Sequence, residues 1–283
     1  MAQDQSSRVW FITGCSTGFG RVLAEEVLKA GGRVVATARR PEQIADLEQK
    51  YPERALALPL DVTREDSVES AVAAAIARFG RIDVLVNNAG YGVAGAIEEV
   101  SEAEFMPMFE TNVFGLIRVT RAVLPQLRRQ RSGHILNISS IGGVAASPGW
   151  GYYQGTKFAV EGLSEALAAE LAPLGIRVSI IEPGPFRTNF LGSGVMAAIQ
   201  IADYDKTAGN ARRYYVEQNG KQAGDPVRAA QAMIAVVESS EPPLRLLLGK
   251  SAMKRLREKL TAWERELDAW ESTTVGADFP EAR

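Results

Sequence analysis

Residues 9–20 read Val9-Trp10-Phe11-Ile12-Thr13-Gly14-Cys15-Ser16-Thr17-Gly18-Phe19-Gly20. The first four residues are apolar and rich in strand formers, and a helical pattern runs from residue 18 to residue 30. Three glycines lie at the junction, where glycine permits a tight turn and lets a phosphate approach the free amides of a helix N-terminus. The spacing is T-G-x-x-x-G-x-G and not G-x-G-x-x-G, and glycine also occurs at such turns for packing alone. The stretch therefore predicts a strand, a turn with room for a phosphate, and a helix.

Strand-like and helix-like runs alternate along the chain. Strands are predicted at residues 9–12, 33–37, 55–60, 82–86, 134–138 and 177–181. Among the helices between them, one is predicted to be capped by Thr63, and another to open with a capping box of Ser101 and Glu104. Asp225-Pro226 predicts the N-cap and first residue of a later helix. With strands of near-continuous valine, isoleucine and leucine, this rhythm predicts an α/β fold: a doubly wound, Rossmann-like parallel sheet in three α/β/α layers. Residues 1–283 are interpreted as a single domain.

Composition narrows the class of protein. The 283 residues are 46% hydrophobic and carry a net charge of -2, which allows a large core and argues against the basic face of a nucleic-acid-binding protein. Cys15 is the only cysteine, so no intrachain disulfide can form and a reducing compartment is expected. Residues 1–8 lack the apolar core of a signal peptide, and no apolar run approaches the roughly 20 residues that span a bilayer. The chain is expected to be cytoplasmic, with no nucleic-acid or membrane partner.

The residues after the second predicted strand bear on the ligand. They read Ala36-Thr37-Ala38-Arg39-Arg40, without the acid that can hold an adenosine ribose in a dinucleotide-binding fold. A guanidinium is planar, permanently charged and suited to a phosphate. We therefore expect Arg39, helped by Arg40, to bind the 2′-phosphate of NADP(H), and NAD(H) is the less favoured cofactor. The alternative is that both arginines are solvated residues of a surface loop.

Ser140, Tyr153 and Lys157 form the candidate catalytic set. Tyr153 and Lys157 are four residues apart and share one face of the predicted helix. A free tyrosine has a pKa of about 10, and a neighbouring ammonium is expected to lower it. Ser140 follows a predicted strand, at the carboxyl edge where such sheets bind ligands. A tyrosine–lysine pair alone is common on ordinary helices, but with Ser140 and the glycine loop it predicts hydride transfer with a nicotinamide cofactor.

From residue 9 to about residue 188 the chain resembles the short-chain dehydrogenase/reductases, in the shorter subgroup with a single Rossmann-like domain. The resemblance rests on the glycine motif from Thr13 to Gly20, Leu60-Asp61-Val62, Asn87-Asn88-Ala89-Gly90, Thr111-Asn112-Val113, the Ser140, Tyr153 and Lys157 set, Pro183-Gly184 and Thr188. The run from Glu182 to Thr188 and the long C-terminal extension look most like the hydroxysteroid and retinol dehydrogenase-like branch. Phe19 departs from the family, which usually has a smaller aliphatic residue there.

The resemblance implies roles for these residues. Tyr153 would exchange a proton with the substrate oxygen, Lys157 would lower the Tyr153 pKa and hold the nicotinamide ribose, and Ser140 would orient the substrate. Asn112 would position a water that relays protons with Lys157. The implied cofactor-binding residues are Gly14, Ser16, Gly18, Phe19, Gly20, Arg39, Arg40, Asp61, Val62, Asn88, Ala89, Gly90, Tyr153, Lys157, Pro183, Gly184, Phe186 and Thr188. No metal is required by this chemistry, and none is expected.

Residues 189–224 are expected to cover the substrate pocket, because they follow the nicotinamide segment directly. Their apolar residues are Phe190, Leu191, Met196, Ile199, Tyr204, Tyr214 and Tyr215. An apolar lid of this kind predicts a hydrophobic ketone or secondary alcohol as substrate. For any single residue, simple coverage of the core is the alternative.

A helix is predicted at residues 250–271. Met253, Leu256, Leu260, Trp263, Leu267 and Trp270 repeat at spacings of three and four and form one apolar face. We interpret this face as packing against the body or a neighbouring subunit; a membrane-surface helix is the minor alternative, and the segment is too short for an independent coiled coil. The family resemblance implies a homodimer or homotetramer, formed largely through the helices after Asn112 and Tyr153.

Three functions are compatible with parts of the pattern. The leading hypothesis is an NADP-dependent carbonyl reductase or alcohol dehydrogenase. A regulatory protein that binds NADPH as a sensor, with little catalysis, would be expected to lack part of the Ser140, Tyr153 and Lys157 set. An epimerase or dehydratase would be expected to have another glycine spacing and a larger C-terminal substrate domain. The sequence does not identify the substrate, its stereochemistry or the working direction.

Overall fold

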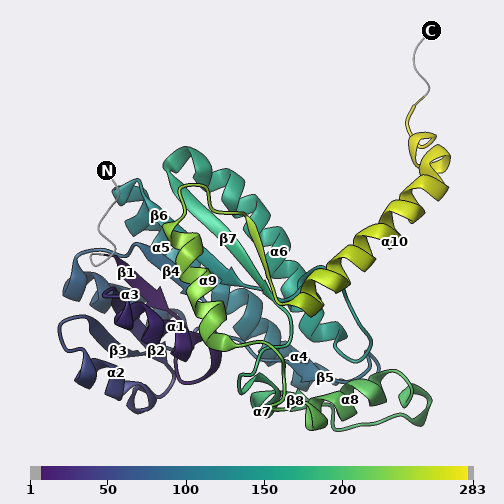
Figure 1. The fold of residues 1–283 in the computed structure, drawn as a ribbon, viewed down its shortest axis with the longest axis horizontal. Coiled ribbons are helices and arrows are strands. Elements are labelled where there is room, and N and C mark those ends of the chain that lie inside the picture. The colour runs from purple at the N-terminus through teal and green to yellow at the C-terminus, as the bar shows by residue number, and fades with distance from the viewer. Residues whose placement is uncertain (1–7, 280–283) are drawn as a thin grey trace.

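A parallel sheet of seven strands organises residues 8–279, which are the residues described in this computed structural model. The strand order is β3-β2-β1-β4-β6-β7-β9 (Figure 1). The strands are β1 Val9–Ile12, β2 Arg33–Ala38, β3 Ala55–Pro59, β4 Val84–Asn87, β6 Gly133–Ile138, β7 Ile176–Pro183 and β9 Arg245–Leu248. The predicted doubly wound α/β sheet is confirmed, and the order reverses direction between β1 and β4, where such sheets bind ligands.

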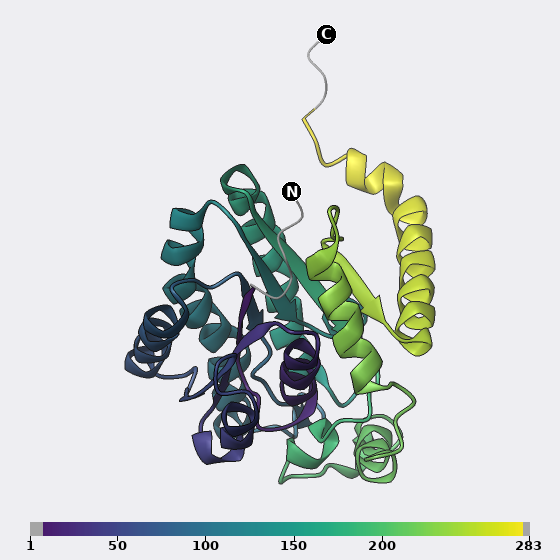
Figure 2. The same cartoon turned by 60° about the vertical axis from the view of Figure 1, so that its left-hand side comes forward.

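Successive residues of each strand face two different helical layers. In β1, Trp10 and Ile12 join a core with α1 Gly18–Lys29, α2 Ala45–Lys50 and α9 Pro226–Glu238, while Val9 and Phe11 join a second core. That second core contains α3 Glu65–Phe79, α5 Leu116–Gln130 and α6 Gly151–Leu171 on the opposite face (Figures 1 and 2). Both faces are buried, which explains why these strands read as continuous apolar runs.

Two of the three predicted helix starts are confirmed. Helix α4 Glu102–Phe109 begins with the capping box, in which the Ser101 backbone N–H donates to Glu104 Oε2 at 2.8 Å. Helix α9 begins after Asp225, whose carboxylate accepts the Val227 N–H at 2.8 Å. The predicted Thr63 cap is wrong: α3 begins at Glu65 after Arg64. Thr63 instead donates two hydrogen bonds to the Asp61 carboxylate, one from its backbone N–H and one from its hydroxyl.

Several short elements were not predicted. Strand β9 pairs with β7 at the sheet edge, and a separate two-stranded sheet joins β5 Val93–Ala94 to β8 Val195–Met196. Residues 189–224 also contain α7 Phe190–Ser193 and α8 Ala208–Glu217. Strand β9 has four residues, begins with Arg245 and follows two prolines. Its apolar run is too short to be distinguished from a loop by periodicity.

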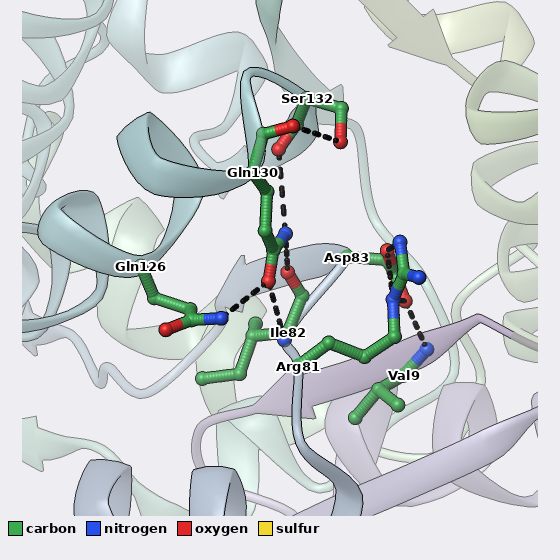
Figure 3. A network of polar contacts seen from close by, with 7 residues as sticks. All are labelled: Val9, Arg81, Ile82, Asp83, Gln126, Gln130 and Ser132. Atoms are coloured by element: carbon green, nitrogen blue, oxygen red, sulfur yellow. Dashed lines mark hydrogen bonds and ion pairs between the residues drawn. The ribbon is translucent and has the colours of Figure 1, made fainter.

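The amino end of the central strands is fixed by a polar network (Figure 3). Asp83 Oδ2 accepts the Val9 N–H at 2.9 Å, and the Arg81 guanidinium donates to the same carboxylate. The Gln130 side chain, at the end of α5, donates to the Ile82 carbonyl at 2.7 Å and accepts the Ile82 N–H at 3.3 Å. These bonds hold the entry into β4 against β1, and thereby fix which residues emerge at the opposite, carboxyl edge.

The C-terminal helix α10 Lys250–Val275 leaves the body after β9 (Figures 1 and 2). Ala252 is buried and Leu256 packs against the body, but beyond Leu256 every residue of the helix is exposed. The prediction of a helix is confirmed. Of the two packing partners predicted for its apolar face, the body is wrong past the first two turns, and a neighbouring subunit stays a prediction. Among the described residues, no helix is both long enough and apolar enough to cross a membrane.

Replacing Asp225 with alanine is expected to lower the free energy of unfolding by about 1 kcal/mol, because the N–H groups at the start of α9 lose their acceptor. Chemical denaturation measures this change. Asp225→Asn is the matched control, because asparagine caps as well as aspartate and should remain within a few tenths of a kcal/mol of the wild type. Equal losses in the two variants would show that the carboxylate acts through charge and not as a cap.

Candidate active site

The glycine loop is fastened to the end of β4 by Thr13 and Asn88. The Thr13 hydroxyl accepts the backbone N–H groups of Asn88 at 2.9 Å and Ala89 at 3.0 Å. The Asn88 amide donates to the carbonyl oxygens of Thr13 at 2.8 Å and Gly14 at 3.0 Å. Because Thr13 is buried, these bonds are shielded from competing water. They hold the turn between β1 and α1 in one shape.

Three glycines are required in this turn, for different reasons. Gly14 and Gly18 have φ angles of 72° and 62°, in the left-handed region that favours glycine. A Cβ on Gly20 would collide with the Gly14 carbonyl oxygen and lie 2.5 Å from Asn88 Nδ2. At Gly18 the nearest atom to such a Cβ would be Thr188 Cβ, at 3.7 Å. The N-terminus of α1 therefore lies beside Thr188, as an anion-binding turn would require.

Residues 183–188 leave β7 and pass close to the glycine loop. Phe186 contacts Phe19 edge to face, with the ring centroids 5.2 Å apart. A Cβ on Gly184 would lie 3.0 Å from Ser251 Oγ, so glycine lets α10 start close to this segment. Phe19, unusual for the family, therefore serves as a packing partner for Phe186.

Arg39 and Arg40 follow β2 and are both exposed. Neither guanidinium donates a hydrogen bond to another of the described residues. The positive charge of Arg39 nevertheless helps to lower the pKa of Asp61 and acts in the same direction on that of Tyr91. Burial alone would raise the Asp61 pKa, but the hydrogen bonds from Thr63 and the nearby arginines outweigh it. Arg39 therefore lies within electrostatic range of Asp61.

Ser140 lies close enough to Tyr153 to act on the pKa of its phenol. Ser140 Oγ accepts the Gly142 N–H at 3.0 Å, which leaves its own proton available for a neighbouring oxygen. Burial raises the pKa of Tyr153 to about 12, and the nearby Ser140 hydroxyl opposes this rise without cancelling it. The predicted lowering of the Tyr153 pKa is therefore wrong for these side chains alone, because the loss of hydration of the phenolate outweighs the influence of Ser140.

Lys157 lies below the ring of Tyr153, with Nζ 5.7 Å from the ring centroid, on the shared helix face that the spacing predicted. Nζ donates to the Ile138 carbonyl at 2.8 Å, which fixes the side chain against β6. Burial lowers the pKa of Lys157 to about 8, and the negative charge of Glu161 opposes that lowering. An ammonium with this pKa can gain or lose a proton near neutral pH.

Glu161 and Glu182 are buried acids behind Lys157 that the sequence reasoning missed. Arg245 Nε lies 3.2 Å from Glu161 Oε2 and 3.5 Å from Glu182 Oε1. Burial and the neighbouring Glu161 charge raise the pKa of Glu182 to about 7. A signal was present for one of them, because Glu161 lies four residues after Lys157 and so on the same helix face.

Asn112 lies in a π-helical turn, Glu110–Gly115, between α4 and α5. Its side chain accepts the Tyr91 N–H at 3.1 Å, and donates to the Tyr91 carbonyl at 2.9 Å and to Thr156 Oγ1 at 3.1 Å. Irregular turns of this kind are frequent at functional sites. The side chain thus connects α6, which carries Tyr153 and Lys157, to the segment after β4.

The remaining predicted residues occupy different positions. Ser16 lies in the glycine loop, Pro183 ends β7, and Gly90 lies beside Asn112, whose Oδ1 would be 2.9 Å from a Cβ there. Val62 is 7% exposed and belongs to the core under α3 and α5. Its side chain contributes to packing and not to the surface of the loop.

Aromatic side chains surround Tyr153. The rings of Phe190 and Trp150 have centroids 5.3 Å and 6.1 Å from that of Tyr153, and Trp150 stacks on Tyr215 at 5.7 Å. Leu191 joins this cluster, and Tyr204 donates its hydroxyl to Glu98 at 2.7 Å. The other three residues predicted for an apolar lid are largely exposed: Met196, Ile199 and Tyr214. Part of the predicted apolar cover therefore points to solvent.

Glu99 fastens residues 189–224 to the body. Its carboxylate is 1% exposed and accepts the backbone N–H groups of Ile201 and Ala96, both at 2.8 Å. Arg212 Nη1, on α8, lies 2.5 Å from Oε2 of the same carboxylate. Burial alone would raise the pKa of Glu99, but these three donors together lower it. One buried acid thus holds two parts of the segment.

In the described part of the chain, neither Cys15 nor any cluster of metal-binding residues indicates a second reactive site. The Cys15 thiol is fully buried, donates to the Ile12 carbonyl at 3.3 Å, and has its pKa raised by burial to about 12. A thiol in that state is unreactive. Within the described part of the chain, no group of three or more histidine, cysteine, aspartate or glutamate residues is arranged to hold a metal ion.

Comparison with known proteins agrees with this geometry. The family model described as short chain dehydrogenase matches residues 8–195. A solved short-chain dehydrogenase from Streptomyces avermitilis is 45% identical with a TM-score of 0.90, and the match covers 96% of this chain and all of that one. An oxidoreductase, BOA17, from Botryotinia fuckeliana is 41% identical over 88% of this chain and 91% of its own length. Human retinol dehydrogenase 8 is 37% identical over 84% of this chain and 80% of its own length.

Related structures contain nicotinamide cofactors of both kinds. A 3-ketoacyl-(acyl-carrier-protein) reductase from Brucella melitensis is complexed with NADH (28% identity, TM-score 0.73, covering 87% of this chain and 98% of that one). An alcohol dehydrogenase from Thermococcus sibiricus is complexed with 5-hydroxy-NADP (28% identity, TM-score 0.71, covering 85% and 95%). With a family match over most of the chain and a site of this form, the chain belongs to the short-chain dehydrogenase/reductase family of oxidoreductases.

Proposed function

We propose that this chain is an NADP(H)-dependent oxidoreductase that interconverts a ketone or aldehyde and an alcohol, with Tyr153 as general acid and base. The observation that carries the proposal is the position of Lys157, whose Nζ lies 5.7 Å from the centroid of the Tyr153 ring and is fixed by the Ile138 carbonyl, with Ser140 beside the same phenol. This group lies at the carboxyl edge of the sheet, where the glycine loop is also found. When bound, the nicotinamide supplies the hydride to a carbonyl or accepts it from an alcohol.

The raised pKa of Tyr153 suits the reductive direction. With a pKa of about 12 the phenol is protonated at neutral pH, so it can donate a proton to the carbonyl oxygen as negative charge develops there. Ser140 hydrogen-bonds the same oxygen and holds it in place. Lys157, whose pKa of about 8 lies near neutrality, then returns a proton to Tyr153. Asn112 is proposed to position a water that connects Lys157 to solvent.

The cofactor is proposed to extend from the glycine loop to Thr188. The amides at the start of α1 would hold its diphosphate, and Asp61 its adenine. Arg39, assisted by Arg40, would hold the 2′-phosphate, because both guanidinium groups are exposed and Arg39 acts electrostatically on the site. The two solved relatives bind NADH in one case and an NADP form in the other, so the preference for NADP rests on the arginines.

The substrate is proposed to be a hydrophobic ketone or alcohol. The aromatic rings of Trp150, Phe190 and Tyr215 line the approach to Tyr153 and favour an apolar ligand. Residues 189–224 would act as its cover, held by Glu99. We further propose that the chain is one domain that works in the cytoplasm as a homo-oligomer. Exposed Phe114 and Phe158, near the start of α5 and on α6, support association through those helices.

Tyr153→Phe is expected to lower turnover of a bulky ketone with NADPH by about 10²–10⁴-fold, because the substrate oxygen loses its proton donor. NADPH affinity, measured by equilibrium fluorescence titration, should change little. The matched control is Tyr152→Phe, which removes a hydroxyl bonded to the Ile97 carbonyl at 3.2 Å, away from Ser140. Retention of most activity by Tyr153→Phe would refute the proton-transfer role. Tight NADPH binding by the wild type without turnover of any ketone or alcohol would indicate a sensor.

Arg39→Ala is expected to weaken NADPH binding by about 10–100-fold, because a charge-assisted hydrogen bond to phosphate contributes about 1.5–3 kcal/mol. NADH binding should change by less than about twofold. Equilibrium titration of both cofactors measures the ratio, with Arg78→Ala as control, since Arg78 is exposed on α3 near Pro52. Equal weakening of both cofactors, or a wild type that prefers NADH, would contradict the role of Arg39.

A further inference from the structure

Helix α10 presents an apolar face that the body covers only in part at Leu256 and leaves exposed elsewhere. Leu260, Trp263, Leu267 and Trp270 are between 51% and 65% exposed, and Met253 is 45% exposed. Two tryptophans on a helix that projects from the body are an unusual exposure for a water-soluble surface (Figures 1 and 2). Because most helical stability in proteins comes from tertiary packing, this length of helix also lacks its ordinary source of stability past Leu256.

The spacing on this face identifies the kind of partner. Met253, Leu256, Leu260, Trp263, Leu267 and Trp270 follow one another at intervals of three and four residues without a break. That is the alternation of a and d positions in a heptad repeat, which forms a narrow seam for a second helix. The partner is therefore expected to be a helix with the same seam, which a second copy of this chain provides.

Charge along the helix determines the orientation of the pair. Most charged residues of the first half are basic, at Lys250, Lys254, Arg255, Arg257 and Lys259, and most of the second half are acidic, at Glu264, Glu266, Asp268 and Glu271. The exceptions, Glu258 and Arg265, lie away from the seam. Two copies in antiparallel orientation would place each basic half against the acidic half of the other. Within the described part of the chain, the six charged residues that flank the seam make no hydrogen bond or ion pair: Lys250, Arg257, Lys259, Glu264, Glu266 and Glu271. Lys259 Nζ lies 5.7 Å from the centroid of the Trp263 ring, on the same face of the helix.

We propose that two copies of this chain associate through an antiparallel pair of α10 helices, centred between Thr261 and Ala262. In this register Met253 faces Trp270 of the second copy, Leu256 faces Leu267, and Leu260 faces Trp263. Each tryptophan then opposes a smaller side chain, which fills the layers evenly. A parallel pair would instead stack each tryptophan on its own copy.

The flanking positions agree with the same register. The e and g positions of a heptad repeat flank the seam of a and d positions. In an antiparallel pair, e positions lie against e positions and g positions lie against g positions. Lys250 then meets Glu271 of the second copy, Arg257 meets Glu264, and Lys259 meets Glu266, so all three pairs are of opposite charge. A parallel pair would bring Glu266 against Glu271 and would be repulsive there.

The body supports such a pair. Ala252 is buried against it, and Arg255 donates to the Ala145 carbonyl at 2.6 Å, so the base of α10 is fixed before association. The helix is about 39 Å long, and an antiparallel pair places the two bodies at its opposite ends. The seam is thus anchored at both ends and is not an independent coiled coil. The interface is also distinct from the one proposed for α5 and α6.

Charge reversal tests the pairing in the full-length protein. The double variant Arg257→Glu and Lys259→Glu, and separately Glu264→Arg and Glu266→Lys, should each halve the mass of the particle in analytical ultracentrifugation at micromolar concentration. An equimolar mixture of the two double variants should regain the wild-type mass, because every flanking pair is then attractive again. The control reverses Lys254 and Arg265 to glutamate, which makes the same change in charge away from the seam and should leave the mass unchanged.

Orientation is tested with nitroxide labels at Glu258→Cys or Thr274→Cys, since buried Cys15 does not react. The separation along the helix axis between the two copies should be about 10 Å for residue 258 and about 38 Å for residue 274. Both distances should disappear in the Arg257→Glu and Lys259→Glu variant. Equal, short distances at both positions would indicate parallel pairing and overturn the proposal. So would unchanged mass in the charge-reversed variants, or a wild type whose α10 binds anionic phospholipid vesicles without self-association.

Discussion

The attachment of the glycine loop to the end of β4 is the constraint on which the candidate site depends. A loop of this kind contains left-handed glycines at residues 14 and 18, and such a chain loses much conformational freedom when it is ordered. The Thr13 hydroxyl and the Asn88 amide make four short hydrogen bonds that compensate for this loss. The segment that begins with Asn88 includes Tyr91, which is bonded to Asn112, and Asn112 is bonded to Thr156 on α6. The same bonds therefore help to fix the glycine loop relative to α6, which carries Tyr153 and Lys157.

Burial acts in opposite directions on the two titrating groups of the site. It disfavours the charged form of each, so it raises the pKa of the Tyr153 phenol to about 12 and lowers that of the Lys157 ammonium to about 8. The pKa of Tyr153 thus lies above the ordinary tyrosine value, and the pKa of Lys157 lies below the ordinary lysine value. The two groups therefore exchange protons in different pH ranges. In the proposed mechanism, the phenol stays protonated until it donates to a substrate oxygen, while the lysine exchanges protons near neutral pH. The negative charge of Glu161 opposes this lowering of the Lys157 pKa, and Glu161 is not proposed to contact the substrate.

Much of this arrangement could be predicted from the sequence, because its motifs are local. The spacing of Tyr153 and Lys157 fixes their shared helix face, and the alternation of strands and helices fixes the carboxyl edge on which Ser140 lies. The sign of the Tyr153 pKa shift could not be predicted, because it depends on the sum of burial and charge from several elements. Strand β9 and the β5–β8 pair could not be predicted, because strands of two to four residues are too short to show a hydrophobic periodicity. The apolar face of α10 could be predicted from the spacing of its residues, but hydrophobic periodicity does not identify the surface that packs against it.

Glu99 attaches residues 189–224 to the body of the protein. The carboxylate of Glu99 needs several donors once it is removed from water, and residues 189–224 supply two of them, the Ile201 N–H and Arg212. Breaking either bond would leave a buried charge short of a partner, so both contacts help to hold the segment against the body. The aromatic cluster of Phe190, Leu191 and Tyr215 is built from that same segment. The contact between Phe190 and the ring of Tyr153 is therefore made by a segment that Glu99 helps to hold against the body.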